Sequence, residues 1–154
     1  NERDGQDYTF LELSQFEAMR EQGDLLEYAQ VYGHWYGVPK QQVLDALRRR
    51  DDVILKLDVQ GAASVKKIIP TAVFIFLGPP TLQDLRSRLE ERDTESDSSM
   101  DLRIHAAELE MESISIFDYY VVSRYGRLDD VVACIDSIVT AEKCRMLPRE
   151  VYYD

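Results

Sequence analysis

The stretch VILKLDVQGAASVKKIIPTAVFIFLG, residues 53–78, decides the predicted fold. It begins and ends with mostly apolar runs, Val53–Asp58 and Ala72–Leu77, which have the length and composition of strands buried on both faces. Between them, residues 61–69 fit a short helix that Pro70 ends. A strand, a helix and a second strand in this order predict a βαβ unit in an α/β protein with a parallel sheet.

The residues after this stretch continue the alternation. Thr81 is a suitable N-cap for a helix over residues 82–92, because Asp84 stands at its third position. A long helix is expected over about 100–115, a third strand over 119–122 and an amphipathic helix over 128–145. Helices should therefore flank the parallel sheet.

The residues before this stretch have a different character. Ser14 and Glu17 form the pattern of a capping box, and Gly23 is a favourable end for the helix they would start. Strand-like residues follow over 25–32, then an aromatic segment over 33–37, and Pro39 suits the first turn of a helix running to about residue 50. We expect residues 5–37 to be an antiparallel insertion carried on the sheet.

Composition limits the classes of partner. The 154 residues have a mass of 17.8 kDa, 45% hydrophobic residues and a formal net charge of −11, which indicates one globular domain. So acidic a chain is not expected to coat a nucleic-acid backbone or an anionic membrane. Two isolated cysteines, a polar start of the chain and no apolar run long enough for a bilayer favour a cytoplasmic protein.

Asp58 is the first candidate functional residue. It stands at the carboxyl end of a predicted strand, where open α/β sheets collect ligands, and a carboxylate there can hold magnesium or its waters. Lys56 lies two residues earlier and would point to the same face of that strand. A solvated Lys–Asp pair at a strand end explains the same pattern.

Three arginines flank a polar loop over residues 93–99. Arg88 and Arg92 lie four residues apart on a predicted helix, and Arg103 opens the next one. This arrangement suits a lid that closes over phosphates and neutralises transferring charge. The simpler alternative is that Asp84, four residues before Arg88, pairs with it.

Glu27 forms a third group with three aromatic residues, Tyr8, Trp35 and Tyr36. A buried carboxylate can accept two N–H bonds from the edge of a guanine ring, and tyrosine hydroxyls can donate to a phosphate. From the residues alone, the core of a small subdomain is the preferred explanation of these aromatic side chains.

Two kinds of site lack their usual pattern. His34 and His105 are far apart in the sequence and no Cys-x-x-Cys pair accompanies them, so a zinc site is not expected. None of the seven glycines is followed by Lys, so these residues contain no Gly-x-x-x-x-Gly-Lys-Ser/Thr phosphate loop.

Several ordered blocks between about residue 2 and Arg145 form one longer pattern. Residues 4–10 are DGQDYTF, residues 26–37 are LEYAQVYGHWYG and residues 57–62 are LDVQGA. Residues 76–95 contain a Pro-Pro-Thr turn and then Arg-Leu-Glu-Glu-Arg-Asp-Thr-Glu. In this order the blocks resemble four motifs of the guanylate kinase family: Asn-Gly-x-Asp-Tyr-x-Phe, Leu-Glu-x-Ala-x-Val-x-Gly-x-x-Tyr-Gly, Ile-Asp-x-Gln-Gly-Ala, and a lid with Arg-Leu-x-x-Arg-Gly-Thr-Glu.

The resemblance implies a P-loop NTPase-like fold with an inserted antiparallel GMP-binding subdomain and a lid. It implies phosphoryl transfer from ATP to GMP, with Mg²⁺, giving ADP and GDP in purine metabolism. Glu27 would recognise guanine and Tyr8 and Tyr36 would hold the GMP phosphate. Asp58 would lie near magnesium and the phosphates. Three arginines would grip the ATP phosphates and the transferring group: Arg88, Arg92 and Arg103.

Four positions depart from the family pattern. Val38 replaces a Ser or Thr near the base, and Lys56 replaces the first Asp of the strand motif, which places more of guanine recognition on Glu27. Asp93 replaces the lid glycine, and Ser123 stands near a common Asn. The family's first strand, phosphate loop and catalytic Lys have no counterpart in these residues.

Two explanations of this difference stay open. The favoured one is that the chain is a truncated stretch of an active kinase, itself inactive. The other is a catalytically inactive guanylate-kinase-like scaffold module. In either case we expect one domain over 1–154, with a GMP subdomain at about 1–37, core at 38–90 and 102–154, and a lid at 91–101. GMP and ATP are the expected partners, without nucleic acid or membrane, in a monomer or homodimer.

Overall fold

The computed structural model describes residues 3–6, 8–31, 33–91, 104–105, 108–111 and 113–151. It divides into two compact units, Asn1–Pro70 with Tyr153–Asp154 and Thr71–Tyr152. Each unit has its own sheet and its own buried side chains.

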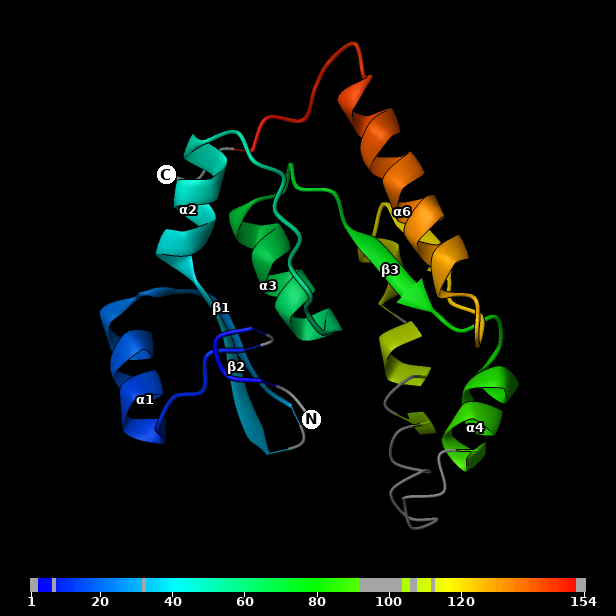
Figure 1. The fold of residues 1–154 in the computed structure, drawn as a ribbon, viewed down its shortest axis with the longest axis horizontal. Coiled ribbons are helices and arrows are strands. Elements are labelled where there is room, and N and C mark those ends of the chain that lie inside the picture. The colour runs from blue at the N-terminus through cyan, green and yellow to red at the C-terminus, as the bar shows by residue number, and fades with distance from the viewer. Residues whose placement is uncertain are drawn as a thin grey trace. The chain divides into compact units, whose positions relative to one another are not determined.

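An antiparallel hairpin forms the centre of the first unit. Strand β1 (Leu25–Val31) pairs with strand β2 (His34–Pro39), as Figure 1 shows in blue, which confirms the predicted antiparallel section. The register sets Glu27 opposite Val38 and Ala29 opposite Tyr36. Because side chains alternate along a strand, Glu27 and Tyr36 belong to the same face of the hairpin.

Helix α1 (Leu13–Gln22) begins earlier than the Ser14–Glu17 pattern predicted. Its N-cap is Glu12, whose backbone N–H donates to Oε1 of Gln15 at 2.9 Å. The predicted capping box was therefore wrong by two residues, since Gln serves at the third helical position as well as Glu. The predicted end is confirmed, because Gly23 has φ 73° and terminates the helix.

Two further helices pack against β1. Helix α2 (Lys40–Arg48) follows β2 directly, with Pro39 as its N-cap, and helix α3 (Val59–Ile68) begins after Asp58. Apolar side chains of these helices, of α1 and of β1 form the core of the first unit, with Ile69 just after α3: Phe16, Leu26, Val43, Ala62, Val65 and Ile69.

The strand predicted over residues 53–58 does not form. The backbone of this segment has no regular structure, and the side chain of Ile54 is 82% exposed. A strand needs a neighbour that completes its backbone hydrogen bonds, and no described strand pairs with this segment. An apolar composition alone could not reveal whether such a neighbour exists.

A short parallel pair forms the sheet of the second unit. Strand β3 (Ile75–Gly78) pairs with β4 (Tyr119–Val122) in a register that sets Ile75 opposite Tyr119 and Gly78 opposite Val122. The prediction for β4 is confirmed residue for residue, whereas β3 starts three residues later than expected. Strand length follows the partner, and β4 offers four residues for pairing.

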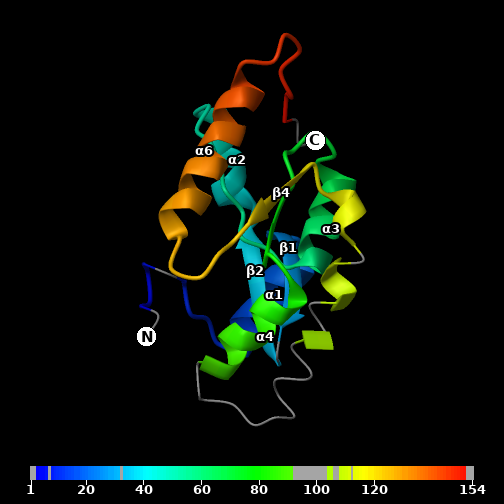
Figure 2. The same ribbon diagram turned by 90° about the vertical axis from the view of Figure 1, so that its right-hand side faces the viewer.

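A helix follows each strand of this pair. Helix α4 (Leu82–Glu91) begins at the predicted place, and helix α6 (Leu128–Lys143) packs against β4 (Figure 2). Described residues 104–105 and 108–111 are helical, within the long helix expected there, and a 3₁₀ turn, η1 (Ile114–Ile116), follows. Four apolar side chains are buried in this unit: Phe74, Phe76, Val121 and Val131.

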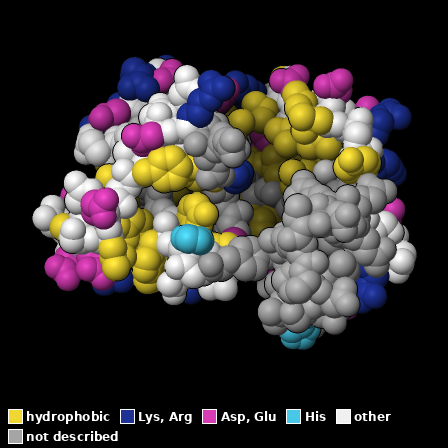
Figure 3. Space-filling model, turned by 60° about the horizontal axis from the view of Figure 1, so that its bottom comes forward, with side chains coloured by type: hydrophobic (Ala, Val, Ile, Leu, Met, Phe, Trp, Pro, Cys, Tyr) yellow, Lys and Arg dark blue, Asp and Glu magenta, His cyan; other side chains and the backbone are white. Residues whose placement is uncertain are grey.

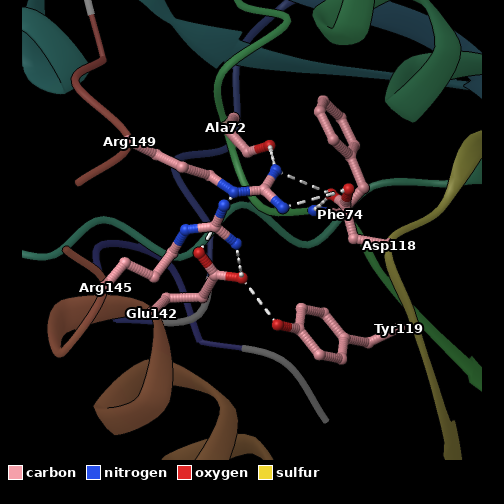
Figure 4. A network of polar contacts seen from close by, with 7 residues as sticks. All are labelled: Ala72, Phe74, Asp118, Tyr119, Glu142, Arg145 and Arg149. Carbon is pink, nitrogen blue, oxygen red and sulfur yellow. Dashed lines mark hydrogen bonds and ion pairs between the residues drawn. The ribbon is translucent and has the colours of Figure 1, made fainter. Parts of the chain in front are cut away.

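A polar network closes the second unit (Figure 4). Arg149, beyond the end of α6, donates to Oε2 of Glu142 at 3.1 Å and to Oδ1 of Asp118 at 3.3 Å. It also donates to the carbonyl of Ala72 at 3.4 Å. Asp118 in turn accepts from the backbone N–H of Phe74 at 2.8 Å. One guanidinium thus joins α6 to the segments before β3 and β4.

The surface is mixed in character. On the face drawn in Figure 3, hydrophobic side chains form patches between groups of acidic and basic side chains. The most exposed large apolar side chains include those of Ile54, Met146 and Leu147. Within the described residues, every helix is too short or too polar to cross a membrane.

Candidate functional site

A buried carboxylate marks the candidate site in the first unit. Glu27, on β1, is only 6% exposed. Among the described residues, no other charged side chain is buried. Its Oε1 has no hydrogen-bond partner among the residues that the structure describes. A buried carboxylate oxygen without a donor is costly in free energy, so this atom is set up to accept from a group outside the described residues, such as a ligand.

The first turn of α3 lies against this carboxylate. Asp58 is the N-cap of the helix, and its Oδ1 accepts from the backbone N–H of Gly61 at 2.7 Å. A Cβ on Gly61 would stand 2.8 Å from Oε1 of Glu27 and 3.2 Å from Oδ1 of Asp58. Two carboxylates therefore approach the same glycine, and Asp58 has the role of a helix cap rather than that of a strand end.

This arrangement changes the proton affinity of Glu27. Burial, and then the negative charge of Asp58, raise the pKa of the Glu27 carboxyl above 4.5. Both effects disfavour the ionised form. A ligand that brings N–H donors to the carboxylate would reverse them, because hydrogen bonds to the ionised form stabilise it.

Two tyrosines and a lysine form a second group in the same unit. The rings of Tyr8 and Tyr36 meet edge to face, with centroids 5.8 Å apart. The ammonium of Lys56 lies 5.8 Å from the centre of the Tyr8 ring, within the range of a cation–π contact. The structure thus brings two hydroxyl-bearing rings and one cation together, which is a suitable set of donors for a phosphate.

The other aromatic residue of the predicted group lies elsewhere. Trp35 packs against Phe16 at 5.8 Å and Tyr28 at 6.3 Å, with the guanidinium of Arg20 5.6 Å from its ring. It precedes Tyr36 in β2 and so faces the opposite side of the hairpin. The subdomain-core explanation thus fits Trp35, whereas the rings of Tyr8 and Tyr36 pack against each other, with Lys56 near the Tyr8 ring.

The arginine group belongs to the second unit and is described only in part. Arg88 lies on α4, whose backbone is described there, and Arg92 and Arg103 lie outside the described residues, as do residues 93–99, for which a loop was predicted. The Thr81 hydroxyl donates to the Asp84 carboxylate, and the backbone N–H of Asp84 donates to the Thr81 hydroxyl oxygen at 3.1 Å. The predicted cap of α4 is therefore confirmed. The phosphate-gripping role of the arginines stays a prediction.

The residues that could meet a metal are few. In the described part of the chain, no three His, Cys, Asp or Glu side chains gather closely enough to hold an ion. Asp58 engages Oδ1 as the helix cap, so Oδ2 is the atom through which it could contact a metal ion or a metal-bound water.

Comparison with known proteins places the chain in a family. Residues 1–142 match the family model described as guanylate kinase. The chain belongs to the guanylate kinase family. The guanylate kinase of Clostridium tetani is 40% identical over 142 residues, which are 92% of this chain and 67% of that protein.

Two further relatives agree with this assignment. The rice protein guanylate kinase 2, chloroplastic/mitochondrial, is 40% identical over 97% of this chain and 53% of its own length. The crystal structure of guanylate kinase from Anaplasma phagocytophilum matches with a TM-score of 0.77 and 27% identity, over 94% of this chain and 70% of that one. The predicted family and α/β fold are confirmed. The chain spans about half to about two thirds of these guanylate kinases.

Two features of the site were not predicted. No role was predicted for Gly61 from the sequence, although a glycine within a predicted helix is a signal of close approach by another group. The pairing of Glu27 with Val38 also went unnoticed, because a register cannot be read from the residues of either strand alone.

Proposed function

We propose that this chain carries the GMP-binding and lid segments of a guanylate kinase, which transfers the terminal phosphoryl group of ATP to GMP and forms ADP and GDP. The observation that carries the proposal is the buried carboxylate of Glu27, whose Oε1 has no hydrogen-bond partner in the described part of the chain. Guanine offers N–H donors at N1 and the 2-amino group, side by side, to such a carboxylate.

Donors for the GMP phosphate lie in the same unit as Glu27. The hydroxyls of Tyr8 and Tyr36 would donate to the phosphate oxygens, and their edge-to-face contact holds the two rings in a defined arrangement. Lys56, close to the Tyr8 ring, would add positive charge. Base and phosphate would thus be held by separate groups of residues, which positions the acceptor oxygen for transfer.

ATP would be held by residues of the second unit. Arg88, Arg92 and Arg103 would contact its phosphates and the transferring group, since phosphoryl transfer depends mainly on positioning and charge neutralisation. Magnesium would enter with ATP, and Asp58 would contact it or its waters through Oδ2. We also propose the division into a GMP subdomain at 1–37, core at 38–90 and 102–154, and lid at 91–101.

The proposal extends to the setting of the enzyme. We propose a cytoplasmic protein, monomeric or homodimeric, with GMP and ATP as its partners and neither nucleic acid nor membrane among them. The acidic balance of the chain, with a formal net charge of −11, supports the exclusion of both polyanionic partners.

Titration calorimetry with GMP tests the binding part of this proposal. The chain should bind GMP and should bind AMP at least tenfold more weakly, because adenine presents an acceptor at N1 where guanine presents a donor. Equal affinity for the two nucleotides would contradict the proposal. Glu27→Gln should remove most of the preference.

An ADP-release assay with GMP, ATP and magnesium tests catalysis. It should be run on the complete product of the gene that encodes this chain, because the 154 residues contain no Gly-x-x-x-x-Gly-Lys-Ser/Thr. That same feature favours the second candidate, an inactive guanylate-kinase-like binding module. GMP-dependent ADP release that falls with Arg88→Ala supports the kinase, and GMP binding without turnover supports the module.

A further inference from the structure

Gly61, in the first turn of α3, lies against the Glu27 carboxylate. A Cβ added to Gly61 would stand 2.8 Å from Oε1 and 2.9 Å from Cδ of Glu27. Carbon and oxygen atoms that are not bonded to each other do not approach so closely without displacement. The present position of the carboxylate therefore requires a residue without a side chain at 61.

Local helix formation does not explain this glycine. Gly61 is the third residue of α3, where alanine is favoured over glycine because glycine loses more conformational freedom. Its backbone N–H donates to Oδ1 of Asp58 at 2.7 Å, and alanine would keep that bond. Its φ is not positive either, so the backbone conformation is open to other residues. The close approach of two carboxylates is the remaining reason, and Glu27, at 2.8 Å from a Cβ at this position against 3.2 Å for Oδ1 of Asp58, is the nearer of the two.

We propose that Gly61 is a positioning residue for purine recognition, which fixes how deeply the Glu27 carboxylate sits against the first turn of α3. This inference rests on the proposed function, because it assumes that Glu27 accepts from the base. A carboxylate pushed out by a methyl group would lose its alignment with the two adjacent N–H donors of guanine. The 2-amino contact, which distinguishes guanine from hypoxanthine, should then be weakened.

The test compares GMP with IMP, which lacks only the 2-amino group. By calorimetry, the unmodified chain should bind GMP roughly tenfold or more tightly than IMP. Gly61→Ala should bring this ratio close to one. Ser64→Ala, a substitution at an exposed position of the same helix, is the matched control and should leave the ratio unchanged.

A double-variant cycle shows whether Gly61 acts through Glu27. In a Glu27→Gln background, Gly61→Ala should change the GMP-to-IMP ratio by less than about twofold, because the group that it displaces no longer discriminates. A merely structural role of Gly61 would instead lower affinity for both nucleotides equally, in either background. That result would overturn the inference.

The remaining outcomes are also decisive. A Gly61→Ala chain that keeps the original ratio overturns the inference, whereas a wild-type chain without preference for GMP overturns the proposed function itself. If Gly61→Ala does not fold, Glu27→Asp should restore folding, because the shorter side chain withdraws the carboxylate from the new methyl group. A double variant that stays unfolded, by circular dichroism, counts against the contact.

Discussion

The hydroxyl of Tyr119 donates a hydrogen bond of 2.6 Å to Oε1 of Glu142, and so joins strand β4 to helix α6. The other carboxylate oxygen of Glu142 accepts from Arg149 at 3.1 Å. The hydrogen bond between Tyr119 and Glu142 holds the pKa of the Glu142 carboxyl below 4.5 and that of the Tyr119 hydroxyl above 10. Both shifts express one preference, for an ionised carboxylate beside a protonated phenol.

Tyr119→Phe should therefore lower the melting temperature by a few degrees, since it removes the donor and keeps the ring. Differential scanning calorimetry measures the change. Tyr125→Phe, at a largely exposed position, is the matched control and should leave the melting temperature within experimental error. Equal behaviour of the two variants would mean that the Tyr119–Glu142 bond contributes nothing to stability.

Acid should weaken the second unit through Glu142. Because its pKa is lower in the folded chain, its stabilising contribution is complete above 4.5 and disappears as the pH falls below 4.5 through the folded value. The hydroxyl of Tyr119 and the guanidinium groups of Arg145 and Arg149 face this carboxylate. Glu142→Gln should be less stable at neutral pH and should show a shallower loss on acidification.

Melting temperatures recorded from about pH 7 to about pH 3 would show this difference. Glu150→Gln, at an exposed position, provides the reference and should follow the wild-type curve. Parallel curves for wild type and Glu142→Gln would place the acid sensitivity in other carboxylates.

Glu27→Gln should stabilise the free chain and weaken nucleotide binding. The substitution removes a charge that is buried beside Asp58 with one oxygen unpartnered, so the melting temperature should rise. It also replaces one acceptor oxygen with a donor, so the Kd for GMP should rise about tenfold to a hundredfold. Thermal melts and calorimetry on the same samples measure both effects.

Glu21→Gln, at an exposed position of α1, is a suitable reference for that comparison. It should change neither quantity. A Glu27→Gln chain that is less stable than wild type would show that the carboxylate has a structural partner, and the assignment of its free oxygen to a ligand would then fail.

Lys56→Gln should weaken binding of GMP and leave binding of guanosine unchanged. Its ammonium lies near the Tyr8 ring, in the group expected to hold the phosphate, so its charge should act on the phosphate alone. We expect the Kd for GMP to rise about tenfold at low salt, with a smaller change at high salt. Lys67→Gln, exposed on α3, is the matched control. Equal losses for GMP and guanosine would contradict a phosphate contact.

Local signals predicted some elements closely and failed where a distant partner decides the structure. The capping pattern of Thr81 with Asp84 and the apolar run of β4 needed no long-range information, and both are confirmed. Residues 53–58 have equally strong strand character, yet form no strand, because pairing depends on a neighbour elsewhere in the chain.

The same distinction applies to the candidate site. The residue types of Glu27, Tyr8 and Tyr36 were enough to suggest a carboxylate and two hydroxyls for a nucleotide. The placement of Glu27 and Tyr36 on one hairpin face came from the register, and the contact of Gly61 with Glu27 came from the packing of α3 on β1. Neither the strand register nor the contact between Gly61 and Glu27 is indicated by a periodic pattern or a motif in the sequence.

The hydrogen bond from Arg149 to the carbonyl of Ala72 also bears on the order in which the two units can fold during synthesis. The helices and strands that pack together in the first unit all precede Thr71 in the chain, so they can assemble while translation continues. The polar network of the second unit, by contrast, is complete only when Arg149 has been synthesised, because Arg149 bonds to Ala72, Asp118 and Glu142. At about 5–20 residues per second, synthesis from Thr71 to Arg149 takes roughly 4–16 s, and the carbonyl of Ala72 lacks its Arg149 contact for nearly all of that time.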